Sequence, residues 1–140
     1  MSERIELSQE LEENLVAYAK KAMEKAYAPY SNFKVGAAVL TSDGNIYMGC
    51  NIENSSFGAT NCAERTAIFK AVSEGHRKFY AIAIVGGKNG EITGICQPCG
   101  ICRQVMSEFG DDNMIVLLGN QSGYRKYTLG EILPLTFHLL

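Results

Sequence analysis

The chain has 140 residues, 46% of them hydrophobic, and carries a net charge of −2 at pH 7. This length fits one domain with a packed core, so we expect residues 1–140 to form a single domain. The slight negative charge gives no basic surface for a polyanion, which argues against polymeric nucleic acid as a partner.

The first 13 residues are acidic and polar, without the basic and apolar regions of a secretory signal. No apolar run approaches the roughly 20 residues that a membrane span needs. We therefore expect a soluble, cytoplasmic protein with no membrane partner. Five cysteines in a reducing compartment favour metal binding or catalysis over disulfides, and their odd number agrees with this.

Helical and strand patterns alternate along the chain. Ser8 is expected to cap a first helix, whose apolar positions recur at helical spacing until Pro29 ends it. Two strands, residues 35–40 and 46–51, flank an Asp-Gly pair that is typical of a hairpin turn. A second helix is expected to begin at Cys62 and to end at Gly75.

The second half continues the alternation. The expected elements are a strand at 80–85 with a glycine-rich turn at 86–90, a helix from Pro98 to about Phe109, strands at 114–118 and 124–127, and a last helix at the capping-box sequence 128–131. Helices that alternate with strands predict an α/β protein in which helices cover a sheet that is part antiparallel and part parallel.

Two short strings carry the strongest functional signal, Cys62-Ala63-Glu64 and Pro98-Cys99-Gly100-Ile101-Cys102. Both fall at expected helix N-termini, where partial positive charge favours thiolate over thiol. Zinc with three protein ligands keeps a fourth position for water and lowers the pKa of that water to roughly 7. We therefore predict a zinc site made by Cys62, Cys99 and Cys102, with Glu64 as the proton-transfer group beside it.

Other polar residues near these strings have two interpretations each. Arg65 and Arg103 are predicted to donate hydrogen bonds to the ligand sulfurs and offset their negative charge, and the alternative is ordinary exposed arginine. Cys50 and Cys96 are expected outside the metal site, although Cys96 is close enough to Cys99 in sequence to be a possible fourth ligand. His76 and His138 are expected to be structural.

These strings, taken together, resemble a cytidine deaminase of the short, three-cysteine kind. The resemblance is strongest over residues 27–109, through segments 28–38, 51–54, 62–67 and 98–104, and it continues into 129–134. It implies a three-layer α/β/α sandwich around a mixed five-stranded sheet. It also implies one Zn²⁺ per subunit and a homotetramer, in which an aromatic residue such as Phe137 reaches a neighbour's site.

The resemblance also implies an activity, the hydrolytic deamination of cytidine and deoxycytidine to uridine and deoxyuridine in pyrimidine salvage. A free pyrimidine nucleoside is then the partner. The implied binding residues are Phe33 against the base, Asn51 and Glu53 on the ribose hydroxyls, Asn54 and Phe57 in the pocket wall, and the backbone around Ala63 on the pyrimidine edge. Asn51 and Glu53 are two residues apart at a strand end, so their side chains point the same way.

Two alternatives remain open from the sequence. A related aminonucleoside or antibiotic deaminase would share the zinc residues but is expected to lack Glu53. A structural zinc module without catalysis would need a fourth ligand, for which Cys96 is available. Gln97 stands where the family carries a small residue, so its side chain is expected either to crowd the exit for ammonia or to face solvent.

Overall fold

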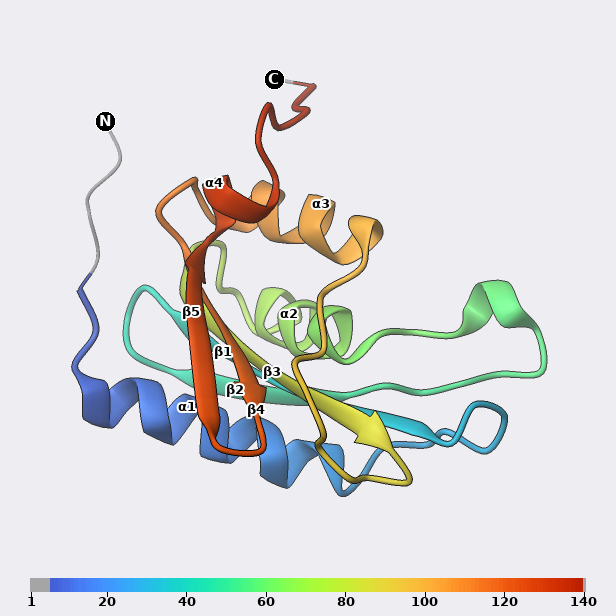
Figure 1. Cartoon of the computed structure of the whole chain (residues 1–140). Coiled ribbons are helices and arrows are strands. Elements are labelled where there is room, and N and C mark those ends of the chain that lie inside the picture. The colour runs from blue at the N-terminus through green and yellow to red at the C-terminus, as the bar shows by residue number, and fades with distance from the viewer. Residues whose placement is uncertain (1–5, 140) are drawn as a thin grey trace.

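The computed structural model of the chain describes residues 6–139 (Figure 1). The described elements are α1 (Gln9–Met23), β1 (Phe33–Thr41), β2 (Ile46–Cys50), the 3₁₀ turn η1 (Phe57–Ala59), α2 (Ala63–Ser73), β3 (Phe79–Lys88), α3 (Gly100–Phe109), β4 (Ile115–Asn120), β5 (Gly123–Thr128) and α4 (Leu129–Ile132). Within the described part of the chain, no helix has the length and apolar character that crossing a membrane requires.

The five strands form one mixed sheet in the order β2-β1-β3-β4-β5. β1 pairs antiparallel with β2 and β3, β3 pairs parallel with β4, and β4 pairs antiparallel with β5. Helix α1 covers one face of this sheet, while α2 and α3 cover the other (Figure 1). The predicted three-layer α/β/α sandwich around a mixed five-stranded sheet is confirmed.

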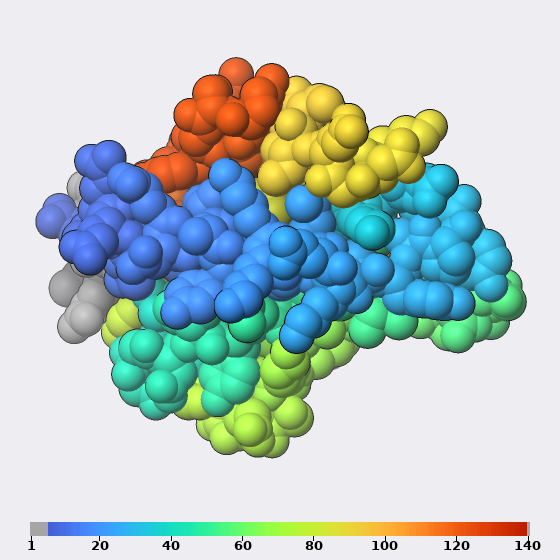
Figure 2. Space-filling view, turned by 90° about the horizontal axis from the view of Figure 1, so that it is seen from below, coloured from blue at the N-terminus to red at the C-terminus, as the bar shows by residue number. Residues whose placement is uncertain are grey.

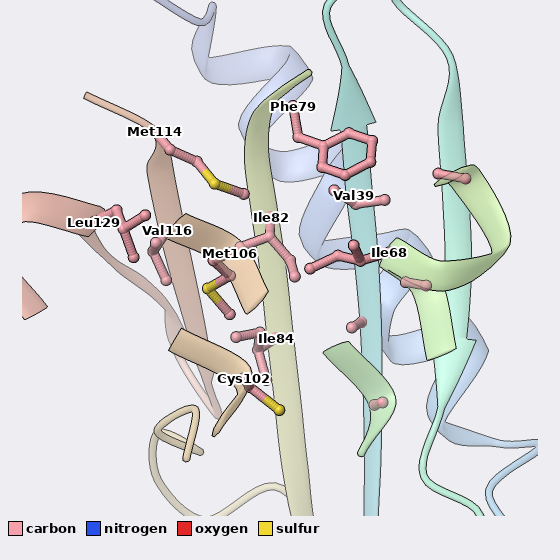
Figure 3. Packing of buried hydrophobic residues seen from close by; sticks show 14 of the residues in the cluster. Val39, Ile68, Phe79, Ile82, Ile84, Cys102, Met106, Met114, Val116 and Leu129 are labelled. Atoms are coloured by element: carbon pink, nitrogen blue, oxygen red, sulfur yellow. The ribbon is translucent and has the colours of Figure 1, made fainter. Parts of the chain in front are cut away.

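Two apolar cores fill the spaces between the layers. The α2 and α3 side contains fully buried residues of both helices and of the sheet, among them Ile68, Ile82, Ile84 and Met106. Figure 3 shows Cys102 in this core beside Ile84 of β3, so one sulfur of the predicted metal site is anchored in the packed interior. Because packed interiors tolerate little displacement, the start of α3 has a fixed position relative to the sheet.

Local signals located the helix starts well and some ends poorly. The Ser8 side chain accepts the Leu11 N–H at 3.1 Å, as predicted for a cap. The first helix ends at Met23, not at Pro29, because the Tyr27 backbone exchanges hydrogen bonds with the chain around Ile52. The expected turn at 86–90 is also shorter than predicted, since β3 continues through Lys88.

Glycine permits α2 to lie directly on the edge of the sheet. A Cβ atom on Gly49 of β2 would stand 2.7 Å from the Ala63 carbonyl oxygen and would overlap the backbone of Ala67. No real Cβ atom tolerates such contacts with backbone, so the first turn of α2 reaches its place only above a glycine. Gly49 therefore sets the distance between the sheet and the helix start that carries Cys62 and Glu64.

Gly49→Ala is accordingly expected to lower the free energy of unfolding by about 1–3 kcal/mol, the usual cost of forcing extra volume into a packed site. Urea unfolding followed by circular dichroism measures the effect. Gly94→Ala is the matched control, because a Cβ at Gly94 meets nothing within 4 Å. Equal stability of the two variants would show that α2 can shift without cost.

Candidate metal centre and nucleoside pocket

The three predicted cysteine ligands come together at two helix starts. Cys62 is the N-cap residue of α2 and Cys99 the N-cap residue of α3, with Cys102 in the first turn of α3. Their sulfur atoms all lie within 4.8 Å of one another, and the Cys62 and Cys99 sulfurs are 4.0 Å apart. Three thiolates bound tetrahedrally to zinc at about 2.3 Å would be about 3.8 Å apart. The group therefore fits a zinc ion with little adjustment.

The environment of the Cys62 sulfur favours negative charge. The Cys62 side chain makes no capping hydrogen bond within α2, and it accepts a hydrogen bond from Nη2 of Arg65 at 3.1 Å. A hydrogen bond from the Cys102 thiol is the main cause that lowers the pKa of Cys62 to about 5, and the Arg65 guanidinium acts in the same direction. The pKa of Cys102 is raised, because its thiol is hydrogen-bonded to Cys62 and is buried.

Glu64 lies in the first turn of α2 and is only 4% exposed. Burial is the main cause that raises the pKa of its carboxyl to about 7, and the negative charge of Cys62 adds to the effect. Desolvation and a neighbouring anion both disfavour a second negative charge, which explains the direction. A carboxyl that is buried next to a cluster of metal ligands is a candidate for proton transfer.

The two arginines do different things. Arg65 contacts the Cys62 sulfur, as predicted, whereas Arg103 makes other contacts in place of the predicted sulfur contact. Arg103 donates from Nε to the Pro98 carbonyl at 2.8 Å and from Nη1 to the Ile132 carbonyl at 2.6 Å. The end of α4 lies against this side of α3 and its free carbonyl groups attract the guanidinium. Arg103 thus fixes the loop that carries Cys99.

Cys50 and Cys96 are not members of the three-sulfur group. Cys96 packs against Gly86, where its sulfur would be 3.0 Å from an added Cβ, and burial raises its pKa to about 12. Cys50 lies on the outer strand β2 and its thiol contacts the Lys25 carbonyl. The structural alternative, which needs Cys96 as a fourth ligand, therefore gains no support from the geometry.

The polar pair Asn51 and Glu53 follows β2 and is joined through Ile52 to the segment just before Cys62. Ile52, between them, exchanges two backbone hydrogen bonds of 2.9 Å with Asn61, the residue before Cys62. The Asn61 side chain in turn donates to Thr66, whose hydroxyl donates to the Cys62 carbonyl at 3.1 Å. This link between the pair and the metal cluster was not predicted, since nothing in the sequence pairs residues 52 and 61.

Asn51 and Glu53 are 9% and 8% exposed, and both are held by the chain itself. The Asn51 amide accepts the Val35 N–H at 2.9 Å and donates to the Phe33 carbonyl at 2.8 Å. Phe33, at the start of β1, remains 40% exposed, which agrees with a ring available to a ligand rather than with a core aromatic. Asn51 therefore fixes the backbone on both sides of Lys34.

Three hydrogen bonds converge on the Glu53 carboxylate. Its Oε1 accepts the backbone N–H groups of Tyr30 at 2.9 Å and Ser31 at 3.1 Å, and its Oε2 accepts the Ser31 hydroxyl. The hydrogen bond from the Ser31 side chain is the main cause that lowers the pKa of Glu53, against an opposing effect of burial. Ser31 was not predicted as a site residue, because a serine in a loop gives no distinctive sequence signal.

The remaining predicted residues lie farther out. Ala63 is fully buried as the first residue of α2. Asn54 and Phe57 belong to an arm, residues 51–61, that extends away from the helices, with η1 at its outer end (Figure 1). The Asn54 side chain accepts the Ser56 N–H at 2.8 Å, and Phe57 is 85% exposed. Within this chain the arm holds Phe57 in solvent and not against the cysteines.

Gln97 and Phe137 lie at the surface. The exposed Gln97 side chain lines a hollow of about 260 Å³ together with Arg103, Tyr127 and Ile132. Phe137 is 64% exposed, and its carbonyl oxygen accepts a hydrogen bond from Gln104 of α3 at 2.9 Å. The C-terminal segment is therefore held to α3 through Gln104, and its apolar side chains are exposed.

Known proteins resemble the chain over most of its length. Cytidine deaminase of Sporosarcina psychrophila is 53% identical over 89% of this chain and 90% of its own. Cytidine deaminase of Halalkalibacterium halodurans is 50% identical over 88% and 91%. The crystal structure of cytidine deaminase from Burkholderia pseudomallei superposes with a TM-score of 0.83 at 50% identity, covering 94% of this chain and 100% of that one.

A deaminase named for another substrate is less similar. Blasticidin-S deaminase of Bacillus cereus is 34% identical over 83% of this chain and 86% of its own. Residues 9–118 match the family described as "Cytidine and deoxycytidylate deaminase zinc-binding region". The chain belongs to the cytidine and deoxycytidylate deaminase family.

Proposed function

We propose that this protein catalyses the zinc-dependent hydrolytic deamination of cytidine and deoxycytidine to uridine and deoxyuridine, with release of ammonia. The observation that carries the proposal is the group of three sulfur atoms within 4.8 Å of one another, with the buried Glu64 two residues after the first. The relatives named above as cytidine deaminases support the same reaction.

The chain offers one Zn²⁺ site per subunit, made by Cys62, Cys99 and Cys102. Zinc bound there supplies a Lewis acid that makes a water molecule acidic near neutral pH. Arg65 offsets part of the negative charge of three thiolates through its hydrogen bond to the Cys62 sulfur. This offset matters because excess negative charge on the ligands weakens zinc as an acid.

Glu64 carries the protons in this proposal. Its carboxylate takes a proton from the attacking water, delivers a proton to N3 of the cytosine ring, and then assists the amino group at C4 to leave as ammonia. The water oxygen forms the new bond to C4 and the bond from C4 to the amino nitrogen breaks, so the ring gains a carbonyl group. Burial of Glu64 keeps bulk water away from these transfers.

The nucleoside lies, in this proposal, between the cysteine cluster and the loop before β1. Phe33 packs on the base and the backbone around Ala63 binds its O2 and N3 edge. Asn51 and Glu53 bind the ribose hydroxyls, because both are held in place and Glu53 retains acceptor capacity beyond its three hydrogen bonds. Asn54 forms the outer wall, which Phe57 of a neighbouring subunit completes, because within its own chain Phe57 is 85% exposed.

A homotetramer is proposed for the assembly. The arm and the C-terminal segment expose large apolar side chains, among them Phe57 at 85% and Phe137 at 64%. Exposed apolar groups of this kind are typical of subunit interfaces. In the tetramer, Phe57 and Phe137 would each complete a pocket on a neighbouring subunit. A place in pyrimidine salvage and a cytoplasmic location go with a free nucleoside substrate.

The role of Glu53 separates a nucleoside deaminase from an antibiotic deaminase with the same zinc residues. Glu53→Gln is expected to raise KM for cytidine about tenfold or more, since a hydrogen bond to a charged group contributes about 1.5–3 kcal/mol. Zinc content should remain at the wild-type value. Loss of cytidine absorbance gives the kinetics, and unchanged kinetics in the variant would remove Glu53 from the sugar site.

A further inference from the structure

The Ser31 hydroxyl lies between two predicted substrate-binding residues. It donates to Oε2 of Glu53 and accepts the Phe33 N–H at 3.0 Å. The loop at residues 27–33 and the arm at residues 51–61 run beside each other, as both Figure 1 and Figure 2 show. Asn32 adopts a left-handed conformation, with φ of 57°, which turns the Phe33 N–H back toward Ser31.

We propose that Ser31 is a positioning residue, whose hydroxyl orients the Glu53 carboxylate toward the sugar and thereby sets the preference for nucleosides that carry ribose hydroxyls. The inference rests on the proposed function, because it concerns how Glu53 binds substrate. It does not concern the metal ligands or the proton-transfer residue, which stand at the starts of α2 and α3.

The acceptor sites of the carboxylate carry the argument. A carboxylate offers about four lone-pair positions, two on each oxygen. Two backbone N–H groups occupy Oε1 of Glu53, and the Ser31 hydroxyl occupies one position on Oε2. The position that remains for a substrate hydroxyl is on Oε2, the oxygen that Ser31 holds. Ser31 therefore decides where the free position of Glu53 points.

The direction of the Ser31 hydrogen bond follows from its second partner. The hydroxyl oxygen accepts the Phe33 N–H, so its single hydrogen is left for the carboxylate. A carboxylate that receives these donors stays ionised, in agreement with the lowered pKa of Glu53. An ionised Glu53 only accepts, which suits the O–H donors of a sugar and offers nothing to a sugar without them.

The test compares cytidine with 2′,3′-dideoxycytidine, which lacks the 2′- and 3′-hydroxyls of the ribose. Ser31→Ala is expected to lower kcat/KM for cytidine about tenfold, mainly through KM, and that for the dideoxynucleoside less than about twofold. Ser31→Thr keeps the hydroxyl, so it should retain most of the wild-type ratio of kcat/KM for cytidine to kcat/KM for the dideoxynucleoside. Ser73→Ala is the matched control, since its hydroxyl bonds only the Lys70 carbonyl among the described contacts.

The ratio of the two substrates is measured on one protein sample, so it does not depend on the fraction that is active. If Ser31→Ala does not fold, Ser31→Cys replaces it, because a thiol is a weak donor of similar size. Equal losses on both substrates, or an unchanged ratio, would overturn the positioning role. A wild-type protein inert on both nucleosides would instead overturn the proposed function.

Discussion

Glu64→Gln is expected to lower kcat for cytidine by about 10⁴-fold while zinc stays bound, because the amide cannot accept and return a proton. The upper end of the usual range applies, since Glu64 serves more than one transfer. Spectrophotometric loss of cytidine gives the rate, and elemental analysis gives the zinc content. The carboxamide has nearly the shape of the carboxyl, so the core around the 4% exposed side chain should be retained.

Glu74→Gln is the matched control for this change. Glu74 is the exposed C-cap residue of α2, at the opposite end of the helix that carries Glu64, and it should show wild-type kinetics. Activity retained in Glu64→Gln would assign the proton transfers to another group. Equal inactivity of wild type and variant, with zinc bound in both, would remove the enzymatic function.

Cys102→Ala is expected to reduce zinc from about one to less than about 0.1 per chain and to abolish deamination. The Cys102 sulfur is one of the three proposed ligands and is fully buried, so we expect no solvent-exposed group to take its place. The zinc contribution to stability is then also lost, because the three sulfurs come together only in the folded chain and metal binding is therefore coupled to folding. Zinc titration and thermal unfolding, with and without a chelator, measure both effects.

The other cysteines provide the controls. Cys50→Ala and Cys96→Ala are both expected to keep one zinc per chain, since neither sulfur belongs to the three-sulfur group. Loss of zinc in Cys96→Ala would identify a fourth sulfur ligand and would favour a structural site. The comparison therefore separates an open metal centre from a closed one without reference to catalytic rates.

The sequence located the three-sulfur group because its determinants are local. Cys62 follows a loop of small and polar residues at the start of a helical pattern, Cys99 follows Pro98 at the start of another, and the spacing of Cys99 and Cys102 places both sulfurs on one turn. The alternation of helices and strands was also enough to predict a mixed sheet covered by helices, whereas the three-layer sandwich around five strands came from the family resemblance. That Cys62 lies beside Cys99 and Cys102 could not be predicted from the spacing of the two motifs alone, and this part of the prediction came from the family resemblance.

What the sequence did not show depends on contacts between distant segments. Arg103 follows its cysteine motif as Arg65 does, yet its guanidinium donates a hydrogen bond to the Ile132 carbonyl at the end of α4. The first helix stops early because Tyr27 pairs with a segment some 25 residues away. Ser31 and Gly49 matter through groups that approach them from elsewhere in the fold, and a single sequence contains no sign of such approaches.

X-ray absorption spectroscopy at the zinc edge of the purified, zinc-loaded protein tests the central claim most directly. Three cysteine ligands with an open position predict three sulfur atoms at about 2.3 Å and one oxygen atom at about 2.0 Å. Addition of a nucleoside that binds without reacting should change the oxygen contribution and leave the sulfur contribution as it was. Four sulfur atoms around the zinc would contradict the account, because no position would remain for water.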